Sequence, residues 1–137
     1  MRRVIFASHG GLSKGMKDSV SMIVGDLAKD VETYSLLPGQ NPEDFYQEVL
    51  KEAKESEEQI VILCDIKGGS VHTALSKLAV LDNVMVFSGM NMGLVLDAVM
   101  KGLNGKLELA EANDLIEAAK DGMTVMNGMT SEDDEDF

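Results

Sequence analysis

The chain has 137 residues and a mass of 14.8 kDa, enough for one compact domain and too little for two of ordinary size. Hydrophobic residues make up 45% and charged residues 26%, which excludes a disordered or fibrous chain and favours a packed core. Acidic residues outnumber basic ones by 24 to 12, so the net charge is −12. Such a surface repels nucleic-acid phosphates and anionic lipids, so we expect no nucleic-acid partner and instead a basic protein partner.

Cysteine usage is compatible with a reducing cytoplasm, and the hydropathy of the chain points to a soluble protein. The single cysteine, Cys64, lies in an apolar run at 60–64 and has no partner for an internal disulfide, so we expect a small buried residue. The apolar stretch at 4–7 is too short for a signal peptide, and no run approaches the roughly 20 residues of a membrane span. Cys and His are too few for a metal cluster. We therefore expect a cytoplasmic protein without a metal or a cofactor.

Short apolar runs rich in β-branched residues alternate with longer segments of helical period, which is typical of a parallel sheet covered by helices. The first expected strand is 3–8. It precedes a helix whose apolar residues recur every three or four positions, namely Leu12, Met16, Val20, Ile23 and Leu27. A second strand at 31–36 ends before a turn at Pro38 and Gly39.

The alternation continues along the rest of the chain. The further expected elements are a helix capped by Asn41 with Pro42 in its first turn, a strand at 60–64, a helix capped by Ser70, a strand at 84–88, a helix after Asn91 and a helix at 110–120. The run at 60–64 shows no polar alternation, which predicts a central strand covered on both faces.

The end of the chain departs from this pattern. The apolar segment at 123–126 follows a tight turn, so we expect a short strand antiparallel to its neighbours. Residues 130–137 form an acidic tail that is expected to be disordered. The expected organisation is a single domain at 1–129 followed by this tail.

Right-handed crossovers and short connections favour an α/β fold with a four-stranded parallel sheet in the flavodoxin-like order 2-1-3-4 and helices on both faces. In that order the connections after strands one and three leave to opposite faces, and a crevice for ligands opens at the C-terminal ends of these strands. His9 follows the first strand and Asp65 follows the third. The two side chains should therefore meet in the crevice.

His9 and Asp65 are suited to nucleophilic chemistry. A neutral imidazole is a good nucleophile when one ring nitrogen is held as N–H and the other is free. The Asp65 carboxylate could accept that N–H and stabilise the positive charge that develops on attack. A plainer interpretation of Asp65 is a cap of the turn into the next helix.

Glycines beside these residues suggest an anion site. Gly10-Gly11 and Gly68-Gly69-Ser70 both open helices, whose unpaired N–H groups favour an anion such as a phosphoryl group. The plainer interpretation of Gly68-Gly69 is a tight turn. His72, in the first turn of the third helix, is expected to be a bystander. Together these residues predict a phosphohistidine at His9.

The same residues resemble a known family. Over about residues 4–126 the chain resembles the enzyme IIA proteins of the mannose family of the bacterial sugar phosphotransferase system. The resemblance rests on four blocks in order: Ala7-Ser8-His9-Gly10 with Leu12 and Gly15, Pro38-Gly39-Gln40-Asn41, Asp65 with Gly68-Gly69-Ser70, and Ser88-Gly89-Met90-Asn91-Met92.

The resemblance implies a phosphocarrier. His9 would take a phosphoryl group on Nε2 from the basic carrier HPr and pass it to an enzyme IIB component, which serves sugar uptake through the membrane components IIC and IID. Asp65 would orient the ring, and Ser70 with nearby backbone amides would hold the phosphoryl group. The resemblance also implies a homodimer whose subunits exchange their last strand, a role that suits the apolar segment at 123–126.

The partner-facing loops differ from the family pattern. Met90 and Asn91 are expected on such a loop. Val71 stands where the family usually has proline after Gly-Gly-Ser, and Gly93 stands where it often has proline after Asn-x. Neither change removes a reacting group, but both bear on the surface that an IIB partner would contact.

Other interpretations share parts of this pattern. The phosphotransfer subunit of dihydroxyacetone kinase has the same fold and an early histidine, but the Asp65–Ser70 block and Pro38-Gly39 favour the sugar-transport branch. A regulatory module could keep the fold and sense phosphorylation. A flavodoxin-like cofactor binder is disfavoured, because an aromatic content of 4% offers little for ring stacking.

Overall fold

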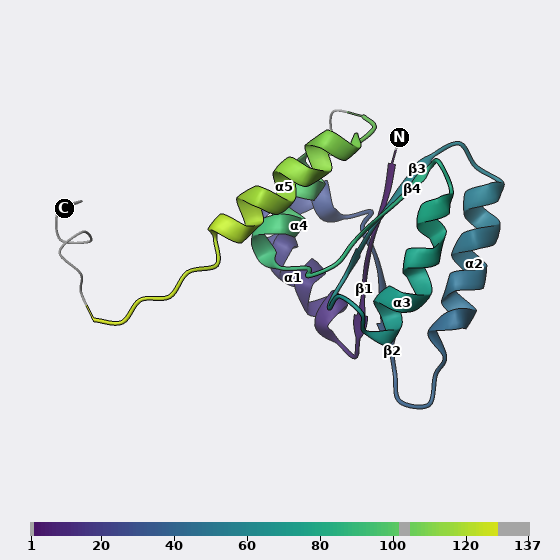
Figure 1. Ribbon diagram of the computed structural model, residues 1–137, viewed down its shortest axis with the longest axis horizontal. Coiled ribbons are helices and arrows are strands. Elements are labelled where there is room, and N and C mark those ends of the chain that lie inside the picture. The colour runs from purple at the N-terminus through teal and green to yellow at the C-terminus, as the bar shows by residue number, and fades with distance from the viewer. Residues whose placement is uncertain (1, 102–104, 129–137) are drawn as a thin grey trace.

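The computed structural model describes residues 2–101 and 105–128, in which strands and helices alternate (Figure 1). The strands are β1 Arg2–His9, β2 Glu32–Leu36, β3 Gln59–Cys64 and β4 Val84–Phe87. The helices are α1 Leu12–Val24, α2 Pro42–Lys54, α3 Ser70–Leu75, α4 Met92–Lys101 and α5 Leu109–Asp121, and the 3-10 segments η1 Gly25–Ala28 and η2 Ser76–Val80 follow α1 and α3. None of these helices is long and apolar enough to cross a membrane.

The strands form one parallel sheet in the order β2-β1-β3-β4, which confirms the expected topology. Helices α2 and α3 cover one face, and α1, α4 and α5 cover the other (Figure 1). Ala7 of β1 pairs with Cys64 of β3, and His9 pairs with Leu36 of β2. The C-terminal ends of β1 and β3 therefore lie side by side, and the chain leaves them toward opposite faces.

Two apolar layers attach the helices to the sheet. Strand β3 is buried along its whole length, as the unbroken apolar run predicts. Successive strand residues point to opposite faces, so Leu63 packs in the layer with α1, α4 and α5, while Ile62 packs in the layer with α2 and α3. Phe6 and Ile5 of β1 divide in the same way. The strand ends that form the crevice thus rest on packed core.

The expected buried face of α1 is only partly correct. Met16 and Val20 are buried. The other three residues, Leu12, Ile23 and Leu27, are 50%, 63% and 44% exposed. The α-helix ends at Val24, because Gly25 adopts a φ of +59°, and a 3-10 segment follows. The helical period of the sequence therefore does not extend to Leu27.

The segment at 123–126 is not a strand in the single chain. Residues 122–128 lead away from the body of the molecule after α5 (Figure 1), and Val125 is 90% exposed. The antiparallel strand expected here is thus absent within one copy, and its exchange with a second copy stays a prediction. The expected acidic tail at 130–137 lies outside the described residues.

Candidate functional site

The crevice brings together His9 and Asp65. His9 is the last residue of β1, and Asp65 is the first residue after β3. Asp65 Oδ2 accepts two hydrogen bonds of 2.8 Å from His9, one from the backbone N–H and one from ring Nδ1. Asp65 Oδ1 accepts a third, of 2.9 Å, from the backbone N–H of Ile66. One carboxylate thus holds both the main chain and the ring of His9.

Asp65 is ionised in this setting. Burial on its own would raise the pKa of this carboxyl, but the hydrogen bonds from the amide and ring of His9 and from the Ile66 amide outweigh burial and lower it. An ionised carboxylate only accepts hydrogen bonds, so Nδ1 of the neutral His9 ring has the proton and Nε2 is an unprotonated acceptor. Burial and the Asp65 charge raise the pKa of the Cys64 thiol to about 12, so this neighbour is no competing nucleophile.

The unprotonated ring nitrogen of His9, Nε2, faces Ser70. Ser70 Oγ lies 3.0 Å from His9 Nε2 and donates to it. We expected Ser70 to be the N-cap of α3, and this is wrong: Gly69 is the N-cap, and Ser70 is the first helical residue. The hydroxyl is therefore directed at the ring instead of at the helix. The His9 side chain is 48% exposed, so the ring is open to solvent.

The glycines shape the loops instead of offering free amides. The N–H groups of Gly10, Gly68 and Gly69, which we expected to be free for an anion, are all paired within the chain. They donate, in that order, to the carbonyl of Leu36 at 2.8 Å, to ring Nδ1 of His72 at 3.1 Å and to the carbonyl of Ile66 at 3.1 Å. The first turn of α3, which begins at Ser70, is where N–H groups lack intrahelical acceptors.

Gly69 has a steric role that sequence reasoning missed. A Cβ at Gly69 would lie 2.7 Å from Ile66 Cγ2 and 3.3 Å from His9 Cε1. Residues other than glycine therefore cannot occupy this position without moving a neighbour. A glycine pair before a helix is the signal in the sequence, but it does not say which ring the backbone approaches.

The loop before α4 does not present Met90 to the outside. Met90 is 7% exposed, packs in the core layer with α1 and α4, and donates its N–H to the carbonyl of Cys64 at 2.9 Å. Asn91 Oδ1 accepts a hydrogen bond of 2.9 Å from the N–H of Leu94 and so caps α4. The expected partner-facing role of Met90 is therefore corrected to a core position, and Asn91 has a capping role.

Other apolar side chains are exposed at this edge of the sheet. Leu12 lies three residues after the end of β1, Leu37 lies one after β2, and Ile66 lies two after β3. Their side chains are 50%, 50% and 59% exposed, in that order. Each lies within three residues of the end of a strand, on the side where His9 is open. The surface around His9 is thus partly apolar although the chain as a whole is strongly acidic.

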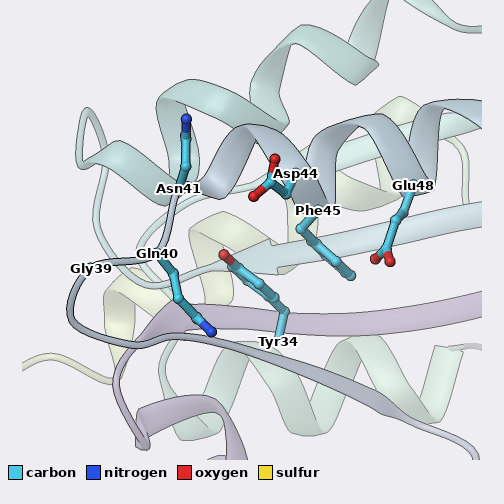
Figure 2. Close-up of a pocket in the computed structure, with 7 residues that line it drawn as sticks. All are labelled: Tyr34, Gly39, Gln40, Asn41, Asp44, Phe45 and Glu48. Atoms are coloured by element: carbon cyan, nitrogen blue, oxygen red, sulfur yellow. The ribbon is translucent and has the colours of Figure 1, made fainter.

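A concavity of about 600 Å³ lies between β2 and α2 (Figure 2). The Tyr34 ring stacks on Phe45 with centroids 4.2 Å apart, and Asp44 and Glu48 add carboxylates to the wall. Burial and these two charges raise the pKa of Tyr34. His9 does not line this pocket. This pocket and the half-exposed His9 ring are therefore separate features of the surface.

Comparisons with known proteins agree with this arrangement. Residues 3–120 match the family model EIIA-man, described as the PTS system fructose IIA component. The chain is 33% identical over 101 residues to the PTS system sorbose-specific EIIA component of Klebsiella pneumoniae, and the match covers 72% of this chain and 73% of that protein.

Solved structures show the same fold. The mannose/sorbose specific IIA subunit of the phosphotransferase system from Enterococcus faecalis superposes with a TM-score of 0.78 at 21% identity, covering 94% of this chain and 97% of that one. The PTS IIA protein associated with the fucose utilization operon of Streptococcus pneumoniae gives 0.73 at 27% identity, covering 90% and 92%. Fold and family model thus agree, and the chain belongs to the mannose-family IIA components of the sugar phosphotransferase system.

Proposed function

We propose that this chain is a cytoplasmic phosphocarrier in which His9 accepts a phosphoryl group on Nε2 from phospho-HPr and passes it to an enzyme IIB component. The observation that supports this most directly is the pairing of His9 with Asp65, because the 2.8 Å bond at Nδ1 leaves Nε2 as the nucleophile. Membership of the IIA family supports HPr as the donor and an enzyme IIB component as the acceptor.

The proposed transfer is an in-line displacement. The lone pair of His9 Nε2 attacks the phosphorus of the phosphohistidine on HPr. The new N–P bond forms as the donor's N–P bond breaks, and the electron pair of the broken bond stays on the donor nitrogen. Asp65 balances the positive charge that develops on the His9 ring through the Nδ1–H bond. Ser70, now beside a phosphoryl oxygen instead of a lone pair, would donate its hydroxyl to that oxygen.

The surface around His9 supports docking of a protein. The exposed apolar residues Leu12, Leu37 and Ile66 offer contacts that exclude water. The net charge of −12 favours a basic donor through long-range attraction. Because Met90 is buried, we assign the partner contact to these three residues and not to the loop before α4.

We also propose that the working unit is a homodimer in which residues 123–126 add to β4 of a second copy. β4 ends the described sheet, with β3 on one side only. A groove of about 220 Å³ beside it is lined in part by Met85, Phe87 and Ile116. The exposed apolar side chains at 123–126 suit this groove, and pairing would cover the free edge.

The phosphoacceptor is tested by incubation with phosphoenolpyruvate, enzyme I and HPr, followed by mass measurement. We expect one acid-labile phosphoryl group on the parent chain, none on His9→Ala and one on His72→Ala. Adding an enzyme IIB component should then discharge the parent. Full labelling of His9→Ala, or phosphate on His72, would overturn the assignment.

A further inference from the structure

A tight turn at residues 66–69 lies against the His9 ring. Its closing hydrogen bond of 3.1 Å runs from the N–H of Gly69 to the carbonyl of Ile66, and Gly68 at its third position has a φ of +79°, as a type II turn requires. A Cβ at Gly69 would be only 3.3 Å from His9 Cε1, the carbon between the two ring nitrogens. Any displacement of this turn therefore changes the space available to the ring.

Helix α3 holds the turn by both polar groups of Gly68. The N–H of Gly68 donates to ring Nδ1 of His72 at 3.1 Å, and the carbonyl of Gly68 accepts from Thr73 Oγ1 at 3.3 Å. Both side chains come from the helix whose first residue, Ser70, contacts His9 Nε2. The turn and the hydroxyl that faces the nucleophile are thus fixed to one element.

The bond from Gly68 determines where His72 has its proton. A ring nitrogen that accepts an N–H has no proton of its own, so the neutral His72 ring is protonated on Nε2. His9 is the reverse, because its Nδ1–H donates to Asp65. The two histidines are therefore held as opposite tautomers, and a protonated His72 could not accept the Gly68 N–H.

We propose that His72 is a positioning residue for phosphoryl transfer. It anchors the turn at 66–69, and this turn supports the His9 ring. This inference rests on His9 being the phosphoacceptor proposed above. His72 neither contacts the phosphoryl group nor replaces His9 as acceptor. It acts on the rate by limiting the orientations of the ring that attacks.

The kinetic test compares two substitutions at His72 with a control at Ser76, the residue that follows α3. His72→Ala removes the acceptor, whereas His72→Asn offers an amide oxygen close to the position of Nδ1. Ser76→Ala removes a hydrogen bond at the C-terminal end of α3, from Ser76 Oγ to the carbonyl of Thr73, and leaves the turn at 66–69 untouched. In rapid-quench transfer from phospho-HPr, we expect His72→Ala to lower the rate at saturating donor by roughly three- to tenfold, the size expected for one neutral hydrogen bond. The concentration of phospho-HPr that gives half the maximal rate should stay unchanged. His72→Asn and Ser76→Ala should transfer phosphate at rates near that of the parent.

Nitrogen NMR of the two imidazoles gives a readout that does not need transfer. We expect His72 protonated on Nε2 and His9 on Nδ1 in the parent, and a shift of the His9 Cε1–H signal in His72→Ala but not in Ser76→Ala. A His72 protonated on Nδ1, an unchanged rate in His72→Ala, or His72→Asn as slow as His72→Ala would each overturn the inference. A parent chain that takes no phosphate on His9 would instead refute the proposed function, and the positioning role with it.

Discussion

Asp65 accepts hydrogen bonds from both the main chain and the ring of His9 and also has a full negative charge. In Asp65→Asn the amide can still cap the turn, but it cannot balance the imidazolium charge and can present its NH₂ to the ring. We expect a folded protein whose phosphoryl transfer is slower by at least about tenfold, since the loss falls on the transition state. Rapid-quench kinetics with circular dichroism as the folding control measure this. Transfer at the parent rate would reduce Asp65 to a turn cap.

The same carboxylate makes stability depend on pH. Its folded-state pKa is lowered, so the folded chain binds this proton less readily than the unfolded chain, whose Asp pKa is about 3.9. The contribution is complete above that value and is lost as the pH falls through the lower folded-state pKa. Urea unfolding of the parent and Asp65→Asn at a series of pH values should show a difference in unfolding free energy that shrinks as the pH falls below the unfolded-state value of about 3.9. If the stability difference between the two proteins grew in acid, the folded-state pKa of Asp65 would be raised and not lowered.

Gly69 offers a steric test of the ring's support. In Gly69→Ala the new Cβ meets Ile66 Cγ2 at 2.7 Å and both the His9 ring and the Ile66 carbonyl oxygen at 3.3 Å. Ile66 is 59% exposed and can rotate away, so we expect little loss of stability but a transfer rate reduced by roughly tenfold or more. Gly11→Ala is the matched control, because nothing lies within 4 Å of its Cβ and its φ of −83° suits alanine.

The double substitution Gly69→Ala with Ile66→Ala removes the closest of the three contacts and leaves those with His9 Cε1 and the Ile66 carbonyl oxygen. It should recover part of the lost rate if crowding of the turn is the cause. Equal rates for Gly69→Ala and Gly11→Ala would show that the ring does not depend on this close approach.

At the scale of elements, the start of α4 depends on Asn91. Its side chain accepts the N–H of Leu94, and a capping Asn replaced by Ala typically costs about 1 kcal/mol. We expect Asn91→Ala to lower the free energy of unfolding by about that amount, and Asn91→Ser to lose much less, because Ser also caps. Urea midpoints measure both. If Asn91→Ala is as stable as the parent but transfers more slowly, Asn91 contacts a partner and not the helix.

The elements show why some features were predictable. The approach of His9 to Asp65 followed from strand order alone, because parallel strands end at one edge and neither residue is far from its strand. The third helix was predictable by its apolar spacing. The face of α1 was predictable only in part: the positive φ of Gly25 ends the helix before Leu27, whereas Leu12 and Ile23 lie near the two ends of α1 and are exposed.

Details of the site depended on turn geometry that periodicity does not contain. Serine is a residue type that favours the N-cap, yet the turn before Ser70 places Gly69 at that position. His72 looked like a bystander because its partner is a backbone N–H four residues earlier, which becomes visible only when Gly68 adopts its positive φ. Met90 lies in a loop by pattern, but its side chain turns inward to the core.

At the scale of the whole molecule, we expect a homodimer that depends on residues 123–126. Val125→Asp places a charge on a side chain that is 90% exposed in one copy, so it should leave each copy folded and disrupt pairing with β4. Val80→Asp is the control, because Val80 is 83% exposed at the end of η2. Sedimentation equilibrium should give monomers for Val125→Asp and dimers for Val80→Asp.

Truncations test the same assembly. Ending the chain after Gly122 should yield a monomer or an insoluble product, since dimer contacts and edge protection are lost together. Removing only residues 130–137 should leave the dimer unchanged. A chain ending at Gly122 that remains a well-folded dimer would rule out strand exchange.

The sheet's hydrogen bonds continue past the strands that hold the site. Gly10 N–H donates to Leu36 on one side of the crevice, and Met90 N–H donates to Cys64 on the other. The residues that follow β1 and β4 are therefore bonded to the sheet itself, and we expect the amide protons of Gly10 and Met90 to exchange with solvent only when the sheet opens. A destabilising change in the distant core would then lower carrier activity by reducing the number of folded molecules, while each molecule that remained folded would transfer phosphate at its full rate.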